Sequence, residues 1–362
     1  MATMLCLSFT VISPAQIING AESSSEVVIY HTNDTHGYLA GDGESIIGID
    51  QVAGLKESTP DSILVDAGDA TQGLPLASLT KGADIIELMN LAGYDLMTAG
   101  NHEFDFGTDQ FLSNVKLADF PILAANIYQD GQPLLQDVQE GNNGCHTIIE
   151  RDGLQIGFFG ITTTDTAGST NPAGIAGLEF KDEIETAKNE IDHLESEGAD
   201  VIIAICHMGD MDASCTSVDL ANALTGEYKD NLDILIDGHS HTIENEETNG
   251  VLIVQTGSGM TGVGKLTLTV SGDEVSAEEQ LLTPQDLTDI TPDAAVAEQL
   301  TQIQDTQAEL LNESVGTSET TLWAGQIGVV AVTRLVETNY GDFSADAFRA
   351  AAESYVQTLG TD

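Results

Sequence analysis

Positively charged residues are scarce in this chain of 362 residues. Lys and Arg together number 10 against 59 Asp and Glu, which gives a formal net charge of −49 at pH 7. A surface of that sign repels phosphate backbones and anionic lipid headgroups, which argues against nucleic-acid and membrane-surface binding. Aromatic residues make up only 5% of the chain, with a single tryptophan, so no aromatic platform for stacking on bases is expected. The acidity suits either a secreted protein or one from a salt-adapted organism, and both origins stay open.

Cysteine is also rare: the four are Cys6, Cys145, Cys206 and Cys215. No two of them are spaced as C-x-x-C, so neither a cysteine-type zinc site nor a redox motif is expected. Cys206 ends an apolar run and is predicted to be a small buried hydrophobic residue. The chain length corresponds to roughly two to three domains and provides a core large enough to fold without disulfides.

No apolar run reaches the ~18 residues that a membrane-spanning helix requires, so no transmembrane segment is expected. The N-terminus does contain a short apolar stretch, Met4–Ile12, followed by small residues as far as Ala21. This pattern is typical of the hydrophobic region and cleavage site of a signal peptide. We therefore predict a leader over residues 1–25 and a secreted, periplasmic or cell-surface location.

Apolar runs of strand length alternate with helical stretches over about residues 26–264. Two of the helical stretches, Ala83–Leu91 and Lys181–Glu195, carry apolar residues at spacings of three and four. Such alternation predicts an α/β layered domain. The predicted strands are Val27–Tyr30, Ile63–Val65, Leu96–Ala99, Ile122–Ala125, Ile156–Ile161, Val201–Ile205, Ile234–Ile236 and Val251–Val254.

The chain changes character beyond this region. Lys265–Val270 alternates polar and apolar residues like a strand with one exposed face. After the polar stretch Ser276–Asp293, the segment Ala294–Leu311 has the apolar spacing of an amphipathic helix, which we interpret as a connector between domains. A new unit begins at about Val315. The match to G-x-G-x-x-G at residues 257–262 lies between two predicted strands, so we interpret it as a loop rather than a dinucleotide site.

Five of the predicted strands end in residues that can bind metal ions. Because ligands bind outside the carboxyl ends of the strands in α/β sheets, we expect these residues to meet at one edge. Glycines beside them let the backbone bend close to an ion. The five segments are Asn33-Asp34-Thr35-His36-Gly37, Asp66-Ala67-Gly68-Asp69, Gly100-Asn101-His102-Glu103, His207-Met208-Gly209-Asp210 and Asp237-Gly238-His239-Ser240-His241.

Carboxylate, imidazole and amide side chains form a mixed nitrogen and oxygen ligand set. This set suits divalent zinc, manganese, iron or cobalt rather than copper(I) or an iron–sulfur cluster. In each D-x-H or H-x-H pair, both ligands lie on one side of an extended segment, so each pair can chelate one ion. A carboxylate such as Asp69 can bridge two ions, and two ions ~3.5–4 Å apart clamp the attacking and leaving oxygens of a displacement at phosphorus.

Each of these motifs is weak alone, and their joint occurrence at five strand ends carries the prediction. His31, His146 and His193 lack such neighbours and are interpreted as ordinary core or surface histidines. Asp210 and Asp237 can equally orient a ligand or cap backbone groups.

The strings NDTHG, DAGDATQG, AGNHEFDFG, HMGD and DGHSHT, in this order, resemble the calcineurin-like metallophosphoesterases. More narrowly, the chain is similar over about Glu26 to Arg349 to the secreted 5′-nucleotidase and UDP-sugar hydrolase group. The resemblance implies an α/β fold: a layered β-sandwich metallophosphoesterase domain flanked by helices, then the beginning of a second α/β domain. We expect the catalytic domain at residues 26–290, a linker helix at 291–314 and an incomplete C-terminal domain at 315–362.

The resemblance also implies a role for each ligand of a pair of divalent ions, whose identity stays open among zinc, manganese, iron and cobalt. One ion would be held by Asp34, His36 and His241, with Asp69 bridging. The other would be held by Asp69, Asn101, His207 and His239. His102 would be the catalytic histidine near the leaving oxygen, and Asp105 would orient it.

The implied reaction is hydrolysis of a nucleoside 5′-monophosphate, or another small phosphate ester, by in-line attack of a metal-bridging hydroxide. A UDP-sugar hydrolase, a 2′,3′-cyclic nucleotide phosphodiesterase and a thiosulfohydrolase would use the same metal edge and stay alternatives. In the resembled group, C-terminal arginines and an aromatic pair bind the nucleotide, and none of Arg151, Arg334 and Arg349 matches them. We therefore expect a C-terminally truncated chain, and a secreted protein that binds metal or nucleotide without turnover is a further alternative.

Overall fold

The computed structural model describes residues 24–210, 213–272, 274–314, 316–327, 330–332 and 335–359. The described residues up to Gln307 form one compact unit, and those from Ala308 onward form a second. The predicted leader, residues 1–25, lies outside the described part except for its last two residues, which begin the first strand. The predicted linker helix at 291–314 contains the boundary between the units, and the domain limits themselves stay predictions.

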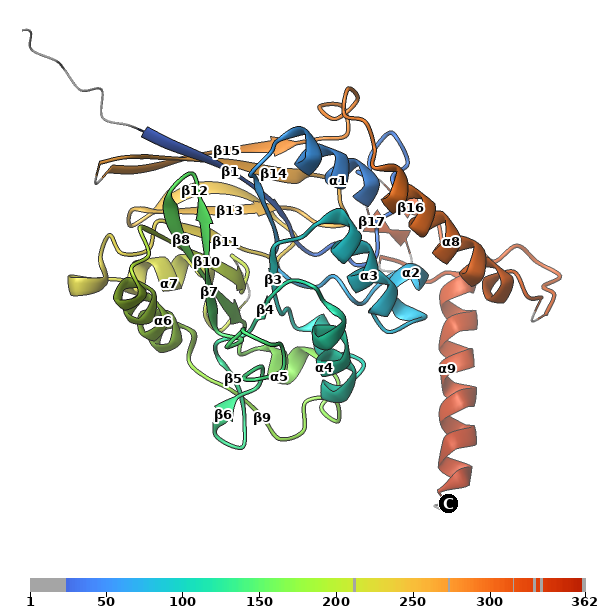
Figure 1. Ribbon diagram of the computed structural model, residues 1–362. Helices are drawn as coiled ribbons and strands as arrows, with labels where there is room; N and C mark the ends of the chain where they lie inside the picture. Colours follow the sequence, from blue (N-terminus) through green and yellow to red (C-terminus); the bar gives the residue numbers. More distant parts are fainter. Residues whose placement is uncertain are drawn as a thin grey trace, which may run out of the picture. The chain divides into compact units, whose positions relative to one another are not determined.

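Two six-stranded sheets make up most of the first unit (Figure 1). All eight predicted apolar runs contribute a strand to one of these sheets. In spatial order, the first sheet contains β15 (Glu274–Leu282), β14 (Val263–Ser271), β1 (Ser24–Thr32), β2 (Ile63–Asp66), β3 (Leu96–Thr98) and β4 (Ile122–Leu123). The second contains β12 (Ile243–Thr248), β13 (Val251–Thr256), β11 (Ile234–Ile236), β10 (Val201–His207), β8 (Leu154–Thr162) and β7 (His146–Arg151).

The two sheets stack because their central strands are apolar on both faces. In β1, Val27 and Ile29 belong to the core between the sheets, whereas Tyr30 packs on the outer face of the first sheet. The side chains of β10 are distributed in the same way: Ile203 lies between the sheets, and Ile202 lies on the outer face of the second sheet. Since side chains alternate along a strand, runs that are apolar at every position predict strands buried on both sides.

Helices cover the two outer faces of this sandwich (Figure 1). Packed on the first sheet are α1 (Ile49–Ser58), α2 (Pro75–Ser78), α3 (Ala83–Ala92), α4 (Thr108–Leu117) and the first part of α8 (Ala294–Leu311). Packed on the second are α6 (Glu183–Glu197) and α7 (Ser217–Ala223), while the short α5 (Thr166–Ser169) follows β8. The helices predicted near residues 83–91, 181–195 and 294–311 are therefore confirmed as α3, α6 and α8.

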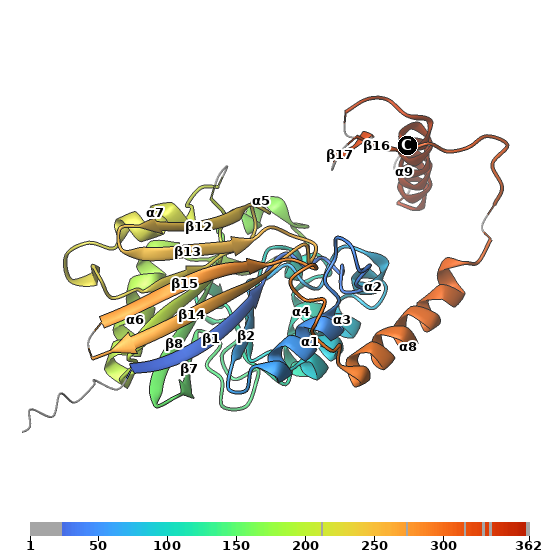
Figure 2. The ribbon, with the colours of Figure 1, turned by 90° about the horizontal axis from the view of Figure 1, so that it is seen from above.

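The segment after residue 264 agrees only in part with the sequence prediction. Lys265–Val270 lies in β14 with Leu266 and Leu268 buried, as expected. The sequence predicts no strand in the polar stretch Ser276–Asp293, yet its first part lies in β15, which pairs antiparallel with β14 (Figure 2). Residues 257–262 join β13 to β14, and a strand rather than a helix follows them, which confirms the loop interpretation.

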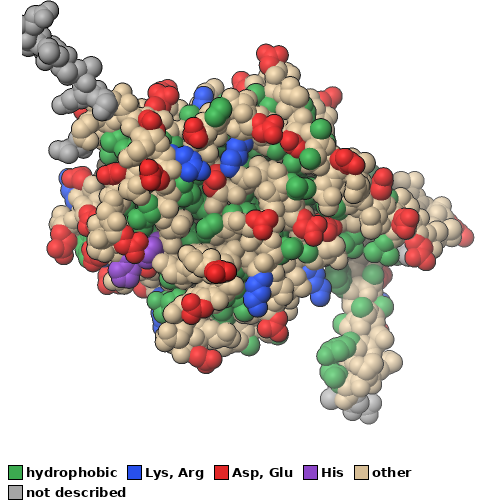
Figure 3. Space-filling view, in the orientation of Figure 1, with side chains coloured by type: hydrophobic (Ala, Val, Ile, Leu, Met, Phe, Trp, Pro, Cys, Tyr) green, Lys and Arg blue, Asp and Glu red, His purple; other side chains and the backbone are tan. Residues whose placement is uncertain are grey.

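The remaining elements are small. A three-stranded sheet contains β6 (Gln132–Pro133), β5 (Ile127–Gln129) and β9 (Leu178–Phe180). The second unit contains the hairpin of β16 (Gln326–Ile327) and β17 (Val330–Ala331) and the long helix α9 (Asn339–Thr358). None of the helices in the described residues is long and apolar enough to cross a membrane. Acidic side chains are spread over the face drawn in Figure 3, where lysines and arginines are few.

Candidate metal centre

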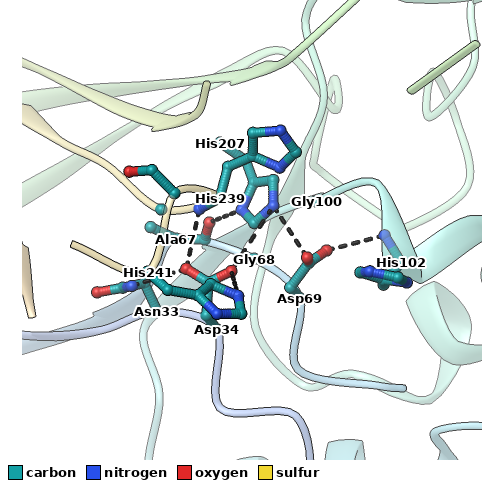
Figure 4. A network of polar contacts seen from close by, with 12 residues as sticks. Asn33, Asp34, Ala67, Gly68, Asp69, Gly100, His102, His207, His239 and His241 are labelled. Atoms are coloured by element: carbon teal, nitrogen blue, oxygen red, sulfur yellow. Dashed lines mark hydrogen bonds and ion pairs between the residues drawn. The ribbon is translucent and has the colours of Figure 1, made fainter. Parts of the chain in front are cut away.

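The five predicted segments meet at one end of the sandwich (Figure 4). Strands β1, β2 and β3 are parallel neighbours in the first sheet, and β10 and β11 are parallel neighbours in the second. Their carboxyl ends therefore deliver side chains from both sheets to the same rim. Most of the polar residues lie in the loops that follow these strands, whereas His207 is the last residue of β10 and His102 begins a short 3-10 helix.

The first group of side chains at this rim consists of Asp34, His36 and His241, whose ligand atoms all lie within 4.8 Å of one another. His241 Nε2 is 3.2 Å from Asp34 Oδ1 and also 3.2 Å from His36 Nε2. His36 Nε2 is 3.9 Å from the same carboxylate oxygen. Three ligand atoms from the loops after β1 and β11 thus converge on one point.

The second group consists of Asp69, His207 and His239, whose ligand atoms also lie within 4.8 Å of one another. His207 Nε2 is 3.1 Å from Asp69 Oδ2 and 4.0 Å from Asp34 Oδ1. His36 Nε2, which belongs to the first group, is 4.0 Å from Asp69 Oδ2. The two groups therefore adjoin each other, because one oxygen of each carboxylate lies 4.0 Å from a histidine nitrogen of the other group.

Each of these carboxylates is fixed through one oxygen and presents the other to the histidines. Asp34 Oδ2 accepts hydrogen bonds from Asn33 Nδ2 at 2.7 Å and from the backbone N–H of His239 at 2.9 Å. Asp69 Oδ1 accepts one from the backbone N–H of His102 at 2.8 Å. The oxygens that face the histidines are thus oriented before any ion binds, which lowers the cost of ordering a ligand set.

Two of the histidines are oriented in the same manner. Nδ1 of His36 donates to the carbonyl of Gln72 at 3.0 Å, and Nδ1 of His207 donates to the carbonyl of Ala67 at 2.7 Å. With Nδ1 used in this way, Nε2 of each ring faces the carboxylates and is the nitrogen available to an ion. This arrangement, with the outer nitrogen bonded to a backbone carbonyl, is the usual one for metal-binding histidines.

Buried polar atoms test whether the residues fit a cation. Among the described residues, Asp34 Oδ1, Asn101 Oδ1 and His207 Nε2 are buried and have no hydrogen-bond partner. Buried polar groups are almost always paired, so atoms left without a partner need another kind of neighbour. Carboxylate, amide and imidazole donors together suit a divalent transition metal. The residues therefore fit such ions.

The backbone of this rim is unusual. Five of the predicted ligands have a positive φ, a region that non-glycine residues adopt uncommonly and that recurs at active sites: Asp34 (47°), His36 (46°), Asp69 (60°), His239 (82°) and His241 (59°). Asp34 and His36 belong to one group, but His239 and His241 fall in different groups. The H-x-H pair therefore does not bring both of its ligands to one group, and the positive φ of His239 and His241 shows that this segment is not extended.

Glu103 is the residue of this centre whose role the sequence analysis missed. Its buried carboxylate accepts hydrogen bonds from the backbone N–H of Asp69 at 2.8 Å and of Gly100 at 2.7 Å. It also accepts from the N–H of Ala70 and from the N–H and hydroxyl of Thr71, at 3.0–3.1 Å. Glu103 thereby joins the loops after β2 and β3. The sequence does contain a hint of this role. Glu103 follows the candidate ligand Asn101 by two residues, and no lysine or arginine lies nearby in the sequence to pair with its charge.

His102 and Asp105 lie together beside the first group. His102 Nδ1 is 2.7 Å from Asp105 Oδ2, and the His102 ring lies 5.4 Å from that of His36, measured between centroids. The hydrogen bond that His102 donates to Asp105 raises the pKa of His102 to about 9. The His102 side chain is 32% exposed, so it remains accessible from solvent.

The electrostatics of the rim favour positive charge. Burial favours the neutral form of Asp69, but the surrounding histidines, His207 above all, together outweigh burial and hold the pKa of Asp69 below its ordinary value. Burial lowers the pKa of His207, yet the Asp69 and Asp34 carboxylates outweigh that effect and raise it to about 10.

Burial raises the pKa of Asp237 to about 6, and one oxygen of this residue accepts hydrogen bonds from the backbone after β10 and β11. Asp237 thus caps backbone N–H groups of these loops, which is one of the two roles considered for it in the sequence analysis.

A third group, His146, Glu190 and His193, also brings metal-binding atoms together. Asn143 Oδ1 accepts two backbone N–H bonds, so its Nδ2 must face His146 Nε2, at 3.0 Å, and donate to it. His146 therefore carries its proton on Nδ1, which donates to Glu190. Both ring nitrogens are used, which agrees with the interpretation of His146 as an ordinary core histidine.

Comparisons with known sequences identify a family that this chain matches. A family model described as calcineurin-like phosphoesterase matches residues 27–242. The trifunctional nucleotide phosphoesterase protein YfkN of Bacillus subtilis is 30% identical over 367 residues, which cover 91% of this chain and 24% of that protein. A snake venom 5′-nucleotidase of Naja atra is 34% identical over 236 residues, covering 60% of this chain and 42% of the relative. The chain thus spans roughly a quarter to under a half of the length of these relatives.

Solved structures share the fold. The crystal structure of a 5′-nucleotidase precursor from Thermus thermophilus has a TM-score of 0.68 at 23% identity, covering 83% of this chain and 62% of the other. That of the calcineurin-like phosphoesterase YfkN has a TM-score of 0.66 at 22% identity, covering 80% of this chain and all of the other. With the family model matching more than half of the sequence, the chain belongs to the calcineurin-like phosphoesterase family.

Proposed function

We propose that the chain is a metal-dependent phosphoesterase that hydrolyses nucleoside 5′-monophosphates to nucleoside and phosphate. The observation that carries the proposal is the pair of adjoining ligand groups, with one oxygen each of Asp34 and Asp69 presented between them. The substrate class is supported by relatives named 5′-nucleotidase or nucleotide phosphoesterase.

The residues of the rim would hold two divalent cations, of which zinc, manganese, iron and cobalt suit the donor atoms. One would be held by Asp34, His36 and His241, with Asp69 bridging, and the other by Asp69, Asn101, His207 and His239. When bound, such a pair supplies an acidified water nucleophile and neutralises charge on the phosphate oxygens.

His102 would assist the departure of the leaving group. Its Nδ1 is held by Asp105, which leaves Nε2 as the nitrogen that can reach a substrate. The ring borders the first ligand group and is partly exposed, so an ester bound at the rim would lie next to it. A histidine in this place can give a proton to the leaving oxygen as negative charge develops there.

A substrate panel tests the proposal. The purified chain, loaded separately with zinc, manganese or cobalt, is offered AMP, UDP-glucose, 2′,3′-cyclic AMP and p-nitrophenyl phosphate, with Asp69→Asn as the control for contaminating phosphatases. We expect release of phosphate from AMP with a kcat/KM at least tenfold above those for the nucleotide sugar and the cyclic nucleotide. Turnover of the aryl ester alone would refute the nucleotide assignment and keep the phosphoesterase centre. No turnover of any ester would refute both.

We also propose that the chain is exported. The apolar stretch Met4–Ile12 supports this, as does the similarity to a snake venom protein. The test is a fusion of residues 1–25 to a reporter that is active only after export, followed by sequencing of the N-terminus of the mature protein. Export with cleavage near residue 25 is expected, and an uncleaved reporter retained in the cytoplasm would contradict the proposal.

A further inference from the structure

The carboxylate that holds His102 has a second partner from a distant part of the chain. Thr170 follows the short helix α5, and its hydroxyl donates to Asp105 Oδ1 at 2.6 Å. The other oxygen of the same carboxylate, Oδ2, is the one that binds His102 Nδ1 at 2.7 Å. Threonine, aspartate and histidine therefore form a continuous chain of hydrogen bonds that ends at the candidate metal centre.

Burial decreases along this chain toward the substrate side. Thr170 is only 9% exposed, whereas the side chains of Asp105 and His102 are 22% and 32% exposed. A carboxylate held through one oxygen can still rotate about its terminal bond and exchange partners with water. A second donor on the other oxygen fixes the plane of the carboxylate and hence the direction of the His102 ring.

The segment that carries Thr170 is attached independently of this hydrogen bond. The carbonyl of Gly174 accepts hydrogen bonds from both the backbone N–H and the hydroxyl of Thr108, at 2.9 Å and 2.7 Å. Thr108 begins α4 three residues after Asp105, so the two segments stay side by side without the Thr170 hydroxyl. Thr166 Oγ1 also bonds within the segment, to the carbonyl of Thr163 at 2.7 Å. Removing one hydroxyl should therefore leave the loop in place.

We propose that Thr170 is a positioning residue for His102, acting through Asp105; this inference rests on the proposed phosphoesterase function. In that reaction the oxygen of water forms a bond to phosphorus, and the bond from phosphorus to the leaving oxygen breaks with its electron pair on that oxygen. His102 Nε2 gives its proton to the leaving oxygen, and the water gives up a proton that restores the imidazolium. Thr170 serves this transfer by keeping Nε2 directed at the leaving oxygen.

The leaving group provides the readout that separates positioning from general damage. A nucleoside alkoxide is a poor leaving group and needs the proton, whereas p-nitrophenolate leaves readily without one. We expect Thr170→Val, which keeps the shape and removes the hydroxyl, to lower kcat for AMP roughly tenfold, with KM unchanged. With p-nitrophenyl phosphate, kcat should change less than twofold. Thr170→Ser, which restores a hydroxyl, should recover most of the AMP rate.

The controls distinguish this inference from the proposed function. Metal content by elemental analysis should be the same in the wild type and both variants. Equal losses on both esters, no loss on either, or no recovery in Thr170→Ser would overturn the role of Thr170 while the wild-type activity still supports the phosphoesterase. If the wild type cleaves neither ester, the proposed function fails. The hydrogen-bond chain is then judged by the ¹H NMR signal of the His102 Nδ1 proton, which should move in Thr170→Val and return in Thr170→Ser.

Discussion

The buried carboxylate of Glu103 offers a direct test of how the rim is held in shape. Oε2 accepts hydrogen bonds from the N–H groups of Asp69 and Gly100, and Oε1 accepts three more from Ala70 and Thr71. In Glu103→Gln, one oxygen becomes an NH₂ group that faces at least two N–H donors. Each lost bond to a charged acceptor costs about 1.5–3 kcal/mol, so we expect the free energy of unfolding to fall by about 3–6 kcal/mol. That is a large part of the ~5–15 kcal/mol of a typical domain.

The assay is urea denaturation of the chelator-treated protein, followed by far-UV circular dichroism. Tryptophan fluorescence would report on the wrong part of the chain, because Trp323 lies in the second unit. Glu87→Gln, at an exposed position of α3, is the matched control and should change the stability by less than about 0.5 kcal/mol. If Glu103→Gln costs no more than this control, the reasoning that Glu103 holds the two loops together is wrong.

Three further outcomes follow from the same geometry. Asp69→Asn should lower metal content and remove turnover, and unchanged activity would refute a bridging role for Asp69. His102→Ala should keep its metal content, measured by elemental analysis, while kcat for AMP falls ~10²-fold or more; loss of metal would show that His102 is a ligand instead. Because the net charge is −49, raising ionic strength from ~10 to ~150 mM should screen repulsion and raise kcat/KM for an anionic ester several-fold. A steady fall over that range would contradict this.

The sequence was most informative where strands are buried on both faces. Runs such as Val201–Ile205 and Ile234–Ile236 are apolar at every position, and both are central strands. The edge strands β7, β12 and β15 escaped prediction because none of them contains an apolar run like those of the central strands. In β15 exposed polar residues alternate with partly buried ones, and most of β12 is exposed. Their pairing is decided by the neighbouring strands, which local composition does not record.

The sequence indicates which residues form the candidate site better than it indicates how they are arranged. A strand that ends in a ligand-rich segment can be read from the sequence, and the parallel order of β1, β2 and β3 brings three such ends together. The separation of His239 from His241 could not be read, because it depends on positive φ at both residues. The contributions of Glu103 and Thr170 depend on hydrogen bonds across loops, to Asp69 and Asp105, that no local pattern encodes.

The central claim is that two divalent cations bind between the two sheets at this rim. The most direct measurement is a crystal structure of the metal-loaded chain with anomalous scattering recorded at the absorption edge of the added metal. The claim predicts two anomalous peaks, one contacting Asp34, His36 and His241 and the other contacting His207 and His239, with Asp69 touching both. A single peak, or peaks away from His207 and His239, would contradict it.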